Sequence, residues 1–320
     1  MNRIIVAGAS QGGVQALRRL AAGLPRGFTA PVLMVLHVGA SESILPSILN
    51  DLAGLPASHA KDGEPILPGR IYVAPPDRHL LVARVRLELS HGPRENWARP
   101  AIDPLFRTAA EWWGPAVVGV VLSGALNDGT SGLYEIKRRG GLAIVQDPAE
   151  AEAPSMPKSA LDNVPVDYRL PVSEIPRLLI DLERQEVRPR EKIEVGASAM
   201  AKTAQRFTEP TAQTCPECGG AMRQETQGSL TRFRCHIGHV MTAEVLAAAQ
   251  LEVLEQDLSV ALRTLKERVA LCDEMADKLA AKGDGAAEAW REAGAEARRR
   301  SDEVRKLTDL DWTSPEAAPS

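Results

Sequence analysis

The sequence predicts an α/β fold, a doubly wound and mostly parallel sheet with helices on both faces, followed by a small zinc-knuckle unit and a helical hairpin. Strand-like and helical segments alternate up to about residue 185. The strand-like segments are continuous apolar runs, which are typical of strands buried on both faces. Several chemically useful side chains follow these runs, at the edge where such sheets place their sites.

The first strand and helix are the most clearly marked elements. Residues 4–6 (Ile-Ile-Val) predict a buried strand, and residues 14–24 predict an amphipathic helix because apolar side chains recur at helical spacing. Ser10 stands in the turn between them. Gly8 and Gly12 give the G-x-S-x-G spacing of a nucleophile elbow, in which small neighbours let the chain turn sharply and leave the serine hydroxyl exposed.

The same alternation continues along the chain. The strand-like segments are residues 31–36, 70–74, 80–83, 86–89, 116–122 and 142–145, and the helical segments are 44–52, 104–113, 129–139, 157–163 and 175–182. His37 ends the second strand, and Asp128 follows the run at 116–122. Ser10, His37 and Asp128 are therefore expected at one edge of the sheet, where a base and an anion could activate the serine.

A nucleotide-binding fold is the main alternative for the glycine-rich turn. The G-x-G-x-x-G spacing fails because Ser10 stands at the second glycine position, and His37 stands where an acidic ribose ligand is expected. Tyr134 and Lys137 are three residues apart, whereas a dehydrogenase pair needs four. A nucleotide-dependent oxidoreductase is thus disfavoured. A non-catalytic signalling adaptor is also disfavoured, because all three residue types of a catalytic triad are present.

Six blocks of this sequence, in order, resemble the catalytic domain of the bacterial chemotaxis protein-glutamate methylesterases of the CheB type. The blocks are residues 8–13, 36–38, 64–79, 99–106, 123–129 and 155–160, and the resemblance covers residues 1 to about 185. It implies that Ser10 is the nucleophile, His37 the general base and acid, and Asp128 its orienting partner. It also implies hydrolysis of glutamyl methyl esters on chemoreceptors, and deamidation of receptor glutamines, without a catalytic cofactor.

The resemblance also carries expectations about the loops around the serine. Main-chain amides near Gln11 and Gly12, together with the loop at Ala125, are expected to hold the oxyanion. In the loop before the aspartate, Leu126 stands where the family has glycine, so a positive φ there would be strained. Because the chain begins directly at the catalytic strand, we expect no receiver domain and no regulation by phosphorylation in cis.

A second group of chemically useful residues follows the predicted catalytic domain. A C-x-x-C pair, a third cysteine after sixteen intervening residues and a nearby histidine provide the ligands of a closed tetrahedral zinc site. The predicted ligands are Cys215, Cys218, Cys235 and His239. His236 competes for the fourth position, but the longer gap to His239, eased by Gly238, lets the chain turn back to the ion. We expect a structural or interaction role, and this segment resembles the zinc-ribbon-like tail of some methylesterase domains. A metal-free unit or a redox pair is the alternative.

The remaining organisation follows from composition and periodicity. Residues 242–281 and 286–310 predict two helices, which form an antiparallel hairpin or a self-associating coil. The predicted domains are residues 1–185 (catalytic), 186–210 (linker), 211–245 (zinc-ribbon-like) and 246–312 (helical hairpin or coil).

Overall charge and cysteine usage restrict the partners and the compartment. A net charge of −4 and a pI near 6.0 argue against nucleic-acid and anionic-membrane binding. No apolar span is long enough for stable membrane insertion. Four cysteines in 320 residues indicate a reducing compartment, so we expect a cytoplasmic protein. Its expected partners are a methylated chemoreceptor or similar signalling protein and a second copy of its own C-terminal helices.

Overall fold

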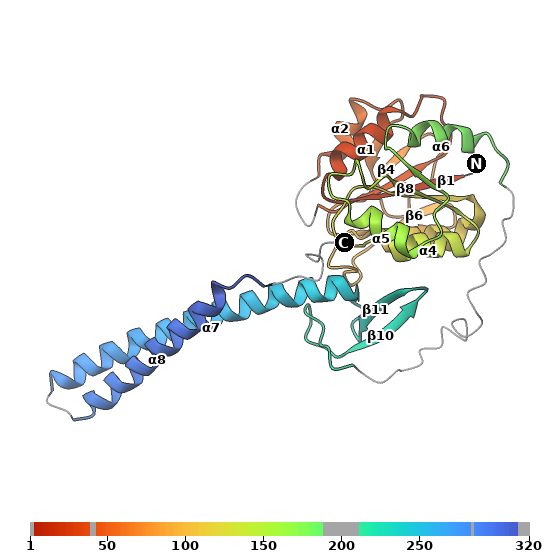
Figure 1. Cartoon of the computed structure of the whole chain (residues 1–320). Coiled ribbons are helices and arrows are strands. Elements are labelled where there is room, and N and C mark those ends of the chain that lie inside the picture. The colour runs from red at the N-terminus through yellow and green to blue at the C-terminus, as the bar shows by residue number, and fades with distance from the viewer. Residues whose placement is uncertain (1–2, 39–42, 188–210, 283–284, 313–320) are drawn as a thin grey trace. The chain divides into compact units, whose positions relative to one another are not determined.

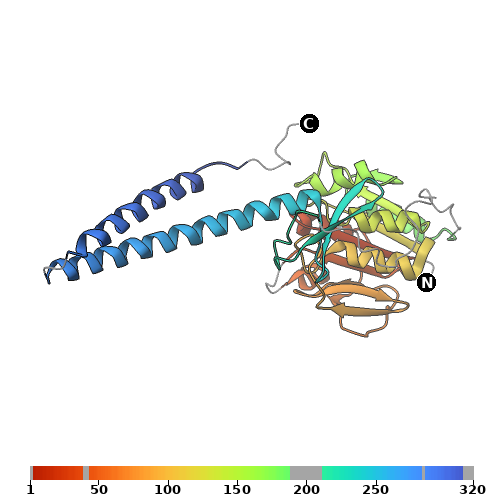
Figure 2. The ribbon, with the colours of Figure 1, turned by 90° about the horizontal axis from the view of Figure 1, so that it is seen from below.

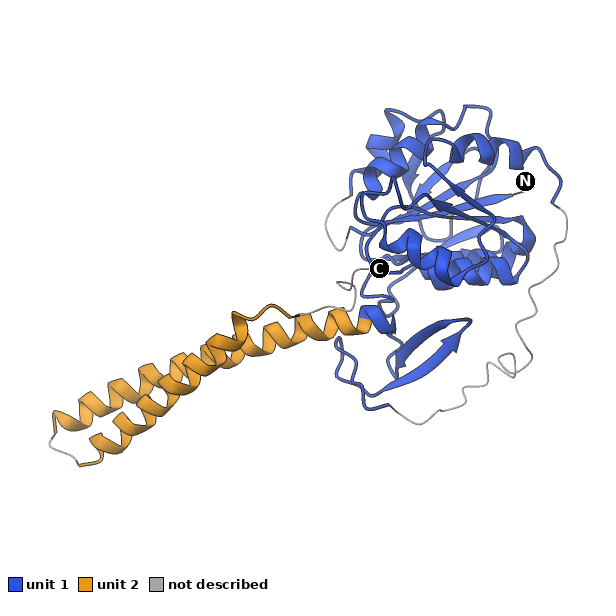
Figure 3. Ribbon diagram, in the orientation of Figure 1, with its two compact units in different colours: residues 1–245 blue, residues 246–320 orange. Residues whose placement is uncertain are grey.

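The computed structural model describes residues 3–38, 43–187, 211–282 and 285–312. These residues form two compact units, residues 1–245 and residues 246–320 (Figure 3). Most of the predicted linker over residues 186–210 lies outside the described residues, as do residues 283–284 between the two predicted C-terminal helices. The predicted catalytic and zinc-ribbon-like segments therefore belong to one compact unit.

The centre of the first unit is a seven-stranded sheet in which all neighbouring strands are parallel. Its strand order is β3-β4-β2-β1-β7-β8-β9. The strands are β1 (Ile4–Ala9), β2 (Val32–Leu36), β3 (Ala57–His59), β4 (Ile71–Val73), β7 (Val117–Val121), β8 (Leu142–Gln146) and β9 (Tyr168–Leu170). The predicted doubly wound parallel sheet is confirmed.

Helices cover both faces of this sheet (Figure 1). The helices are α1 (Gly13–Ala22), α2 (Leu45–Asn50), α3 (Ile102–Trp113), α4 (Thr130–Arg138), α5 (Ser155–Asn163) and α6 (Ile175–Glu183), with a 3₁₀ turn, η1 (Gly114–Ala116), after α3. Alternate residues of β1 enter different cores: Ile5 packs with Leu17 of α1, whereas Ile4 packs with Phe106 of α3. The continuous apolar runs of the sequence follow from this burial on two sides.

Short strands account for most differences from the predicted elements. The predicted hairpin is present as β5 (His79–Ala83) and β6 (Arg86–Ser90), which pair antiparallel in a sheet of their own. The edge strands β3 and β9 were not predicted, because three residues are too few for a periodic signal.

The cysteine-rich segment forms a three-stranded antiparallel sheet, which was also not predicted. Its strands are β10 (Met222–Gln227), β11 (Leu230–Cys235) and β12 (Val240–Thr242), in that order. We call residues 211–242 the ribbon. Its last strand lies beside the loop after β6, where the Asn96 amide donates to the Val240 carbonyl at 2.8 Å. The ribbon thus contacts the α/β unit through the loop after β6.

The second unit is a helical hairpin made from most of α7 (Ala243–Ala280) and from α8 (Ala287–Thr308). Figure 2 shows α8 running back along α7. Cys272 of α7 is buried opposite Gly294, whose added Cβ would lie 3.2 Å from the Cys272 Cβ, and Arg298 pairs with Asp273. The predicted antiparallel hairpin is therefore observed. In the described part of the chain, no helix combines the length and the apolar character that crossing a membrane requires.

Candidate active site

The three predicted catalytic side chains meet at the carboxyl edge of the sheet. Ser10 follows β1, His37 follows β2, and Asp128 lies in the loop between β7 and α4. Strands β2 and β7 flank β1 on opposite sides. The site therefore lies where the strand order reverses direction, as expected for doubly wound sheets.

A continuous hydrogen-bond relay joins the three residues. The His37 Nδ1 atom lies 3.1 Å from the Ser10 Oγ atom, and the His37 Nε2 atom lies 2.8 Å from the Asp128 Oδ2 atom. Nε2 carries the proton when it donates to the carboxylate, which leaves the Nδ1 lone pair to accept from the serine. The Asp128 side chain is 3% exposed and the His37 side chain 20%. The base is thus reachable from solvent while its anionic partner is buried.

Glycines around Ser10 are required by close contacts and by backbone conformation. Gly12 has a φ of +71° at the start of α1, a conformation that side chains other than glycine rarely adopt. A Cβ on Gly8 would lie 2.4 Å from Ile102. A Cβ on Gly124 would lie 2.0 Å from the Met156 sulfur and 2.9 Å from the Ser10 Cβ. The G-x-S-x-G spacing therefore has a steric cause in this fold.

The Asp128 carboxylate is held by five donors. They are His37 Nε2 at 2.8 Å and the Ile102 amide at 2.7 Å on Oδ2, and Asn96 Nδ2 at 2.8 Å, the Gly129 amide at 2.9 Å and the Asp103 amide at 3.3 Å on Oδ1. Burial opposes its ionisation, but the hydrogen bonds and the charge of His37 hold the pKa of Asp128 below its ordinary value. Asp128 is therefore an anion fixed in orientation.

A second buried carboxyl group, Asp103, lies beside Asp128. Asp103 Oδ1 accepts the Gly132 amide at 2.6 Å, and its Oδ2 accepts Asn96 Nδ2 at 2.9 Å. Burial and the nearby charge of Asp128 raise the pKa of Asp103 to about 7. The Asn96 amide thus bridges two carboxyl groups that share a buried site.

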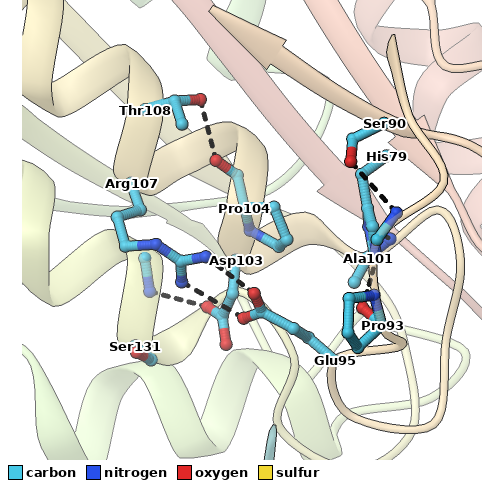
Figure 4. A network of polar contacts seen from close by, with 12 residues as sticks. His79, Ser90, Pro93, Glu95, Ala101, Asp103, Pro104, Arg107, Thr108 and Ser131 are labelled. Carbon is cyan, nitrogen blue, oxygen red and sulfur yellow. Dashed lines mark hydrogen bonds and ion pairs between the residues drawn. The ribbon is translucent and has the colours of Figure 1, made fainter. Parts of the chain in front are cut away.

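An ion pair neutralises the next carboxylate along this network. Glu95 accepts two hydrogen bonds from Arg107, at 2.7 and 3.1 Å (Figure 4). Burial opposes ionisation of Glu95, but the charge and hydrogen bonds of Arg107 hold its pKa below the ordinary value. Asp103 stands beside this pair in Figure 4. The environment of Asp128 is therefore a polar network with several charges, not an isolated carboxylate.

Sequence reasoning assigned no role to Asn96, Asp103, Glu95 or Arg107 of this network. Asp103 lies in residues 99–106, one of the blocks that carry the family resemblance, but the resemblance assigned no function to its side chain. Asn96 belongs to no motif. The structure also gives Leu126 a φ of +62°, so a non-glycine residue occupies the left-handed region in the loop before Asp128.

The predicted metal ligands come together in the ribbon. One ligand atom each from Cys215, Cys218, Cys235 and His239 lies within 4.8 Å of the others. The Cys218 and Cys235 sulfurs are 3.6 Å apart, close to the separation of about 3.8 Å that two thiolates have on a tetrahedral zinc. His236 is outside this group, and its ring lies where a Cβ on Gly220 would stand. Gly238 has a φ of +106° in the turn that leads to His239.

Known proteins are similar to the part of the chain that contains the seven-stranded sheet. Residues 5–179, more than half of the chain, match the CheB methylesterase family. A solved structure, the CheB methylesterase catalytic domain of Thermotoga maritima, is similar with a TM-score of 0.55 and 35% identity, over 57% of this chain and 99% of that one.

Two curated relatives differ in how much of their own length is matched. A Leptospira interrogans protein, provisionally named protein-glutamate methylesterase/protein-glutamine glutaminase, is 42% identical over 188 residues, which are 58% of this chain and 97% of that protein. The protein-glutamate methylesterase/protein-glutamine glutaminase 2 of Anaeromyxobacter dehalogenans is 38% identical over 182 residues, which are 57% of this chain and 53% of that protein. The family match ends at residue 179, before the ribbon and the hairpin.

Proposed function

Because this chain belongs to the CheB methylesterase family, we propose that it hydrolyses glutamyl methyl esters on a methylated chemoreceptor, and deamidates glutamines at the same site. The observation that carries the proposal is the Ser10-His37-Asp128 relay at the carboxyl edge of the sheet. Two hydrogen bonds in series provide what a serine nucleophile needs, a base and an anion that orients it.

The reaction begins with proton transfer within the relay. His37 Nδ1 takes the Ser10 proton as Oγ attacks the ester carbonyl, and Asp128 stabilises the imidazolium without taking the proton. The imidazolium then protonates the departing methanol, which leaves an acyl group on Ser10. Water, deprotonated by His37, attacks this ester and releases the glutamate side chain. A glutamine amide reacts through the same intermediate and releases ammonia.

The oxyanion of each tetrahedral intermediate needs hydrogen-bond donors. The Gly13 amide is already donated to the Ser10 carbonyl at 2.8 Å, so we assign the preceding amides, those of Gln11 and Gly12, to the oxyanion. The loop at Ala125 faces the same strand end and is the candidate for a further donor. Each such donor contributes roughly 3 to 4 kcal/mol to the transition state.

The Cys215, Cys218, Cys235 and His239 set fits zinc in ligand type and spacing. Three thiolates and one imidazole fill a tetrahedral site, so no position remains for a substrate. When bound, the ion supplies crosslinks among segments of the ribbon. We therefore propose a structural zinc that contacts neither the substrate nor the reacting atoms.

The decisive experiment is methanol release from methylated receptor membranes. The full chain should release methanol, and Ser10→Ala should not. A serine-directed phosphonate should label the wild-type protein once and leave Ser10→Ala unlabelled. Methanol release that survives Ser10→Ala would contradict the proposed nucleophile, and a wild-type chain that releases none would support the adaptor alternative.

A further inference from the structure

The ribbon contacts the loop that carries the catalytic aspartate. Thr242, the last residue of β12, donates from Oγ1 to the Asn127 Oδ1 atom at 2.9 Å, and Asn127 Nδ2 donates to the Glu244 Oε2 atom at 2.8 Å. Asn127 and Thr242 are 4% and 1% exposed. Asn127 immediately precedes Asp128, so both polar atoms of the side chain next to the aspartate are engaged by residues beyond 240.

The same strand contacts the second asparagine of the network. The Asn96 amide donates to the Val240 carbonyl at 2.8 Å, while its side-chain Nδ2 donates to Asp128 and to Asp103. β12 therefore holds the residue before Asp128 as well as the side chain that bonds to its Oδ1 atom. These two contacts reach the carboxylate from opposite ends of one short strand.

Charge from the ribbon completes the buried network. Arg232 of β11 is 6% exposed, donates to Ser131 Oγ at 2.9 Å, and has Nη2 3.7 Å from the Glu95 Oε2 atom. The carboxyl groups of Glu95 and Asp103 thus interact electrostatically with Arg107 from α3 and Arg232 from the ribbon.

The loop that carries Asp128 contains a strained backbone conformation that contacts from other segments can stabilise. Leu126 has a φ of +62°, a backbone conformation that is unfavourable for residues other than glycine. Such a conformation persists only when the surrounding structure stabilises it. The hydrogen bonds of Asn127 to Thr242 and Glu244 act one residue further along. They are contacts that can hold the loop against relaxation at Leu126.

We propose that the ribbon, together with the first turn of α7, is a clamp in cis on the catalytic aspartate, with Thr242 and Glu244 as positioning residues that act through Asn127. This inference rests on the proposed esterase function of Ser10. The ribbon is three short strands with few buried apolar side chains, and β10 has one buried residue among its six. A small unit of this kind depends on its metal for folding, and metal occupancy therefore controls how firmly Asp128 is held.

The direct test removes one hydroxyl group. Thr242→Val keeps the shape but deletes the donor to Asn127 and a long 3.4 Å contact from the Val245 amide, and we expect kcat for a small ester to fall about tenfold with KM within about twofold, the effect of losing the buried hydrogen bond to Asn127. Thr242→Ser keeps the hydroxyl and should restore the rate. Thr231→Val is the matched control, because Thr231 lies on β11 and its neighbour Arg232 pairs with Thr242, so its side chain points to the opposite face.

A second readout does not depend on catalysis. The amides of Ile102, Asp103 and Gly129 donate to the Asp128 carboxylate, so their hydrogen exchange reports how firmly it is held. Thr242→Val should speed their exchange about tenfold while retaining about one zinc per chain. Removing zinc from the wild type with a chelator should speed it at least as much, and added zinc should reverse the change.

Three results would overturn the clamp. They are unchanged kcat and exchange in Thr242→Val, an equal loss in Thr231→Val, and a loss that Thr242→Ser does not restore. A misfolded Thr242→Val would be recognised by its loss of zinc, and Glu244→Ala then provides the same comparison from the other side of Asn127. If the wild type hydrolyses no ester, the proposed function fails, and the exchange rates still decide whether the ribbon holds Asp128.

Discussion

The catalytic edge and the metal-ligand cluster both collect side chains from distant segments, but they hold them in different ways. The Ser10, His37 and Asp128 side chains bond directly at 2.8 to 3.1 Å, and the strands beneath them are fully buried. The metal ligands contact one another through sulfur and imidazole at 3.4 to 3.6 Å, in a small sheet in which β12 is fully buried but β10 and β11 have exposed or half-buried residues.

This difference teaches what each centre needs. The core of the α/β sheet positions the triad before any substrate arrives, which is the condition for electrostatic preorganisation. The cysteine cluster has no comparable core, so an ion must supply the energy that brings thiolates together. Substitutions at the first centre should therefore remove activity and spare the fold, whereas substitutions at the second should unfold the ribbon.

The largest effect should come from the triad. Ser10→Ala should lower kcat by roughly 10⁴- to 10⁶-fold with little change in thermal stability, because the serine is half-buried in a turn. His37→Ala should lower it similarly. The Ser10→Ala/His37→Ala double variant should be little worse than either single variant, since the two residues act as a unit. Losses that multiply in steady-state kinetics would contradict the relay.

The next effect should come from the ribbon. Cys235→Ser should abolish stoichiometric zinc binding, measured by elemental analysis, and should lower kcat about tenfold through the lost contacts to Asn127. Cys272→Ser is a matched control, because Cys272 is also buried but lies in the helical hairpin and does not belong to the ligand cluster. Cys235→Ser protein that keeps a full zinc would sink the proposed ligand set.

The sequence predicts the parts of the fold that are buried on both sides. Strands β1, β2, β7 and β8 are fully buried, so each appears in the sequence as a continuous run of mostly apolar residues. Strand β10 contains Arg, Gln, Glu and Thr in sequence and is largely exposed, so neither apolar alternation nor a run marks it. Its structure depends on pairing with β11 and on the cysteine cluster.

The candidate site divides in the same way. Ser10, His37 and Asp128 could be predicted because the ends of parallel strands meet, and the cysteines and His239 because ligand spacing is a local pattern. Asn96 and Asn127 could not be assigned partners. Their contacts join segments far apart in the chain, 117 residues in the case of Asn127 and Glu244, and no single-sequence pattern encodes such a pair.

A smaller effect concerns the pH dependence of stability. The pKa of Asp103 is about 7 in the folded protein, against 3.8 for a free side chain, so between pH 4 and 7 the folded state binds a proton that the unfolded state releases. Its contribution to the free energy of unfolding is therefore complete below about pH 4 and decreases as the pH rises to 7. Asp103→Asn should be less stable overall, yet its stability should change less between pH 5 and 7.

Urea unfolding at pH 5 and at pH 7 measures this difference. Asp147→Asn serves as the control: hydrogen bonds from Arg169 and the Ala149 amide hold the pKa of Asp147 below its ordinary value, so it is ionised in both states over this range. Asp147→Asn should leave the pH difference as in the wild type. An identical pH difference in Asp103→Asn and wild type would show that Asp103 is not the proton-binding group.

The smallest effect on turnover should come from removing the helical hairpin. Every hydrogen bond that the described residues make to Asn127 or Asp128 comes from residues up to 244. A chain cut after residue 250 keeps the ribbon and Glu244, so its kcat for a small ester should stay within about twofold of the wild type. A chain cut after residue 185 loses Thr242 and should be at least as impaired as Thr242→Val, about tenfold.

The sequence alone favours a tail that serves partner choice and leaves chemistry unaffected. Comparing the two truncated proteins tests this hypothesis separately for the ribbon and for the hairpin. Mass in solution measured for both would show whether the hairpin mediates self-association. Equal activity in the two truncated proteins would mean that the ribbon contributes nothing to Asp128, and a large loss on cutting after residue 250 would mean that the hairpin takes part in catalysis.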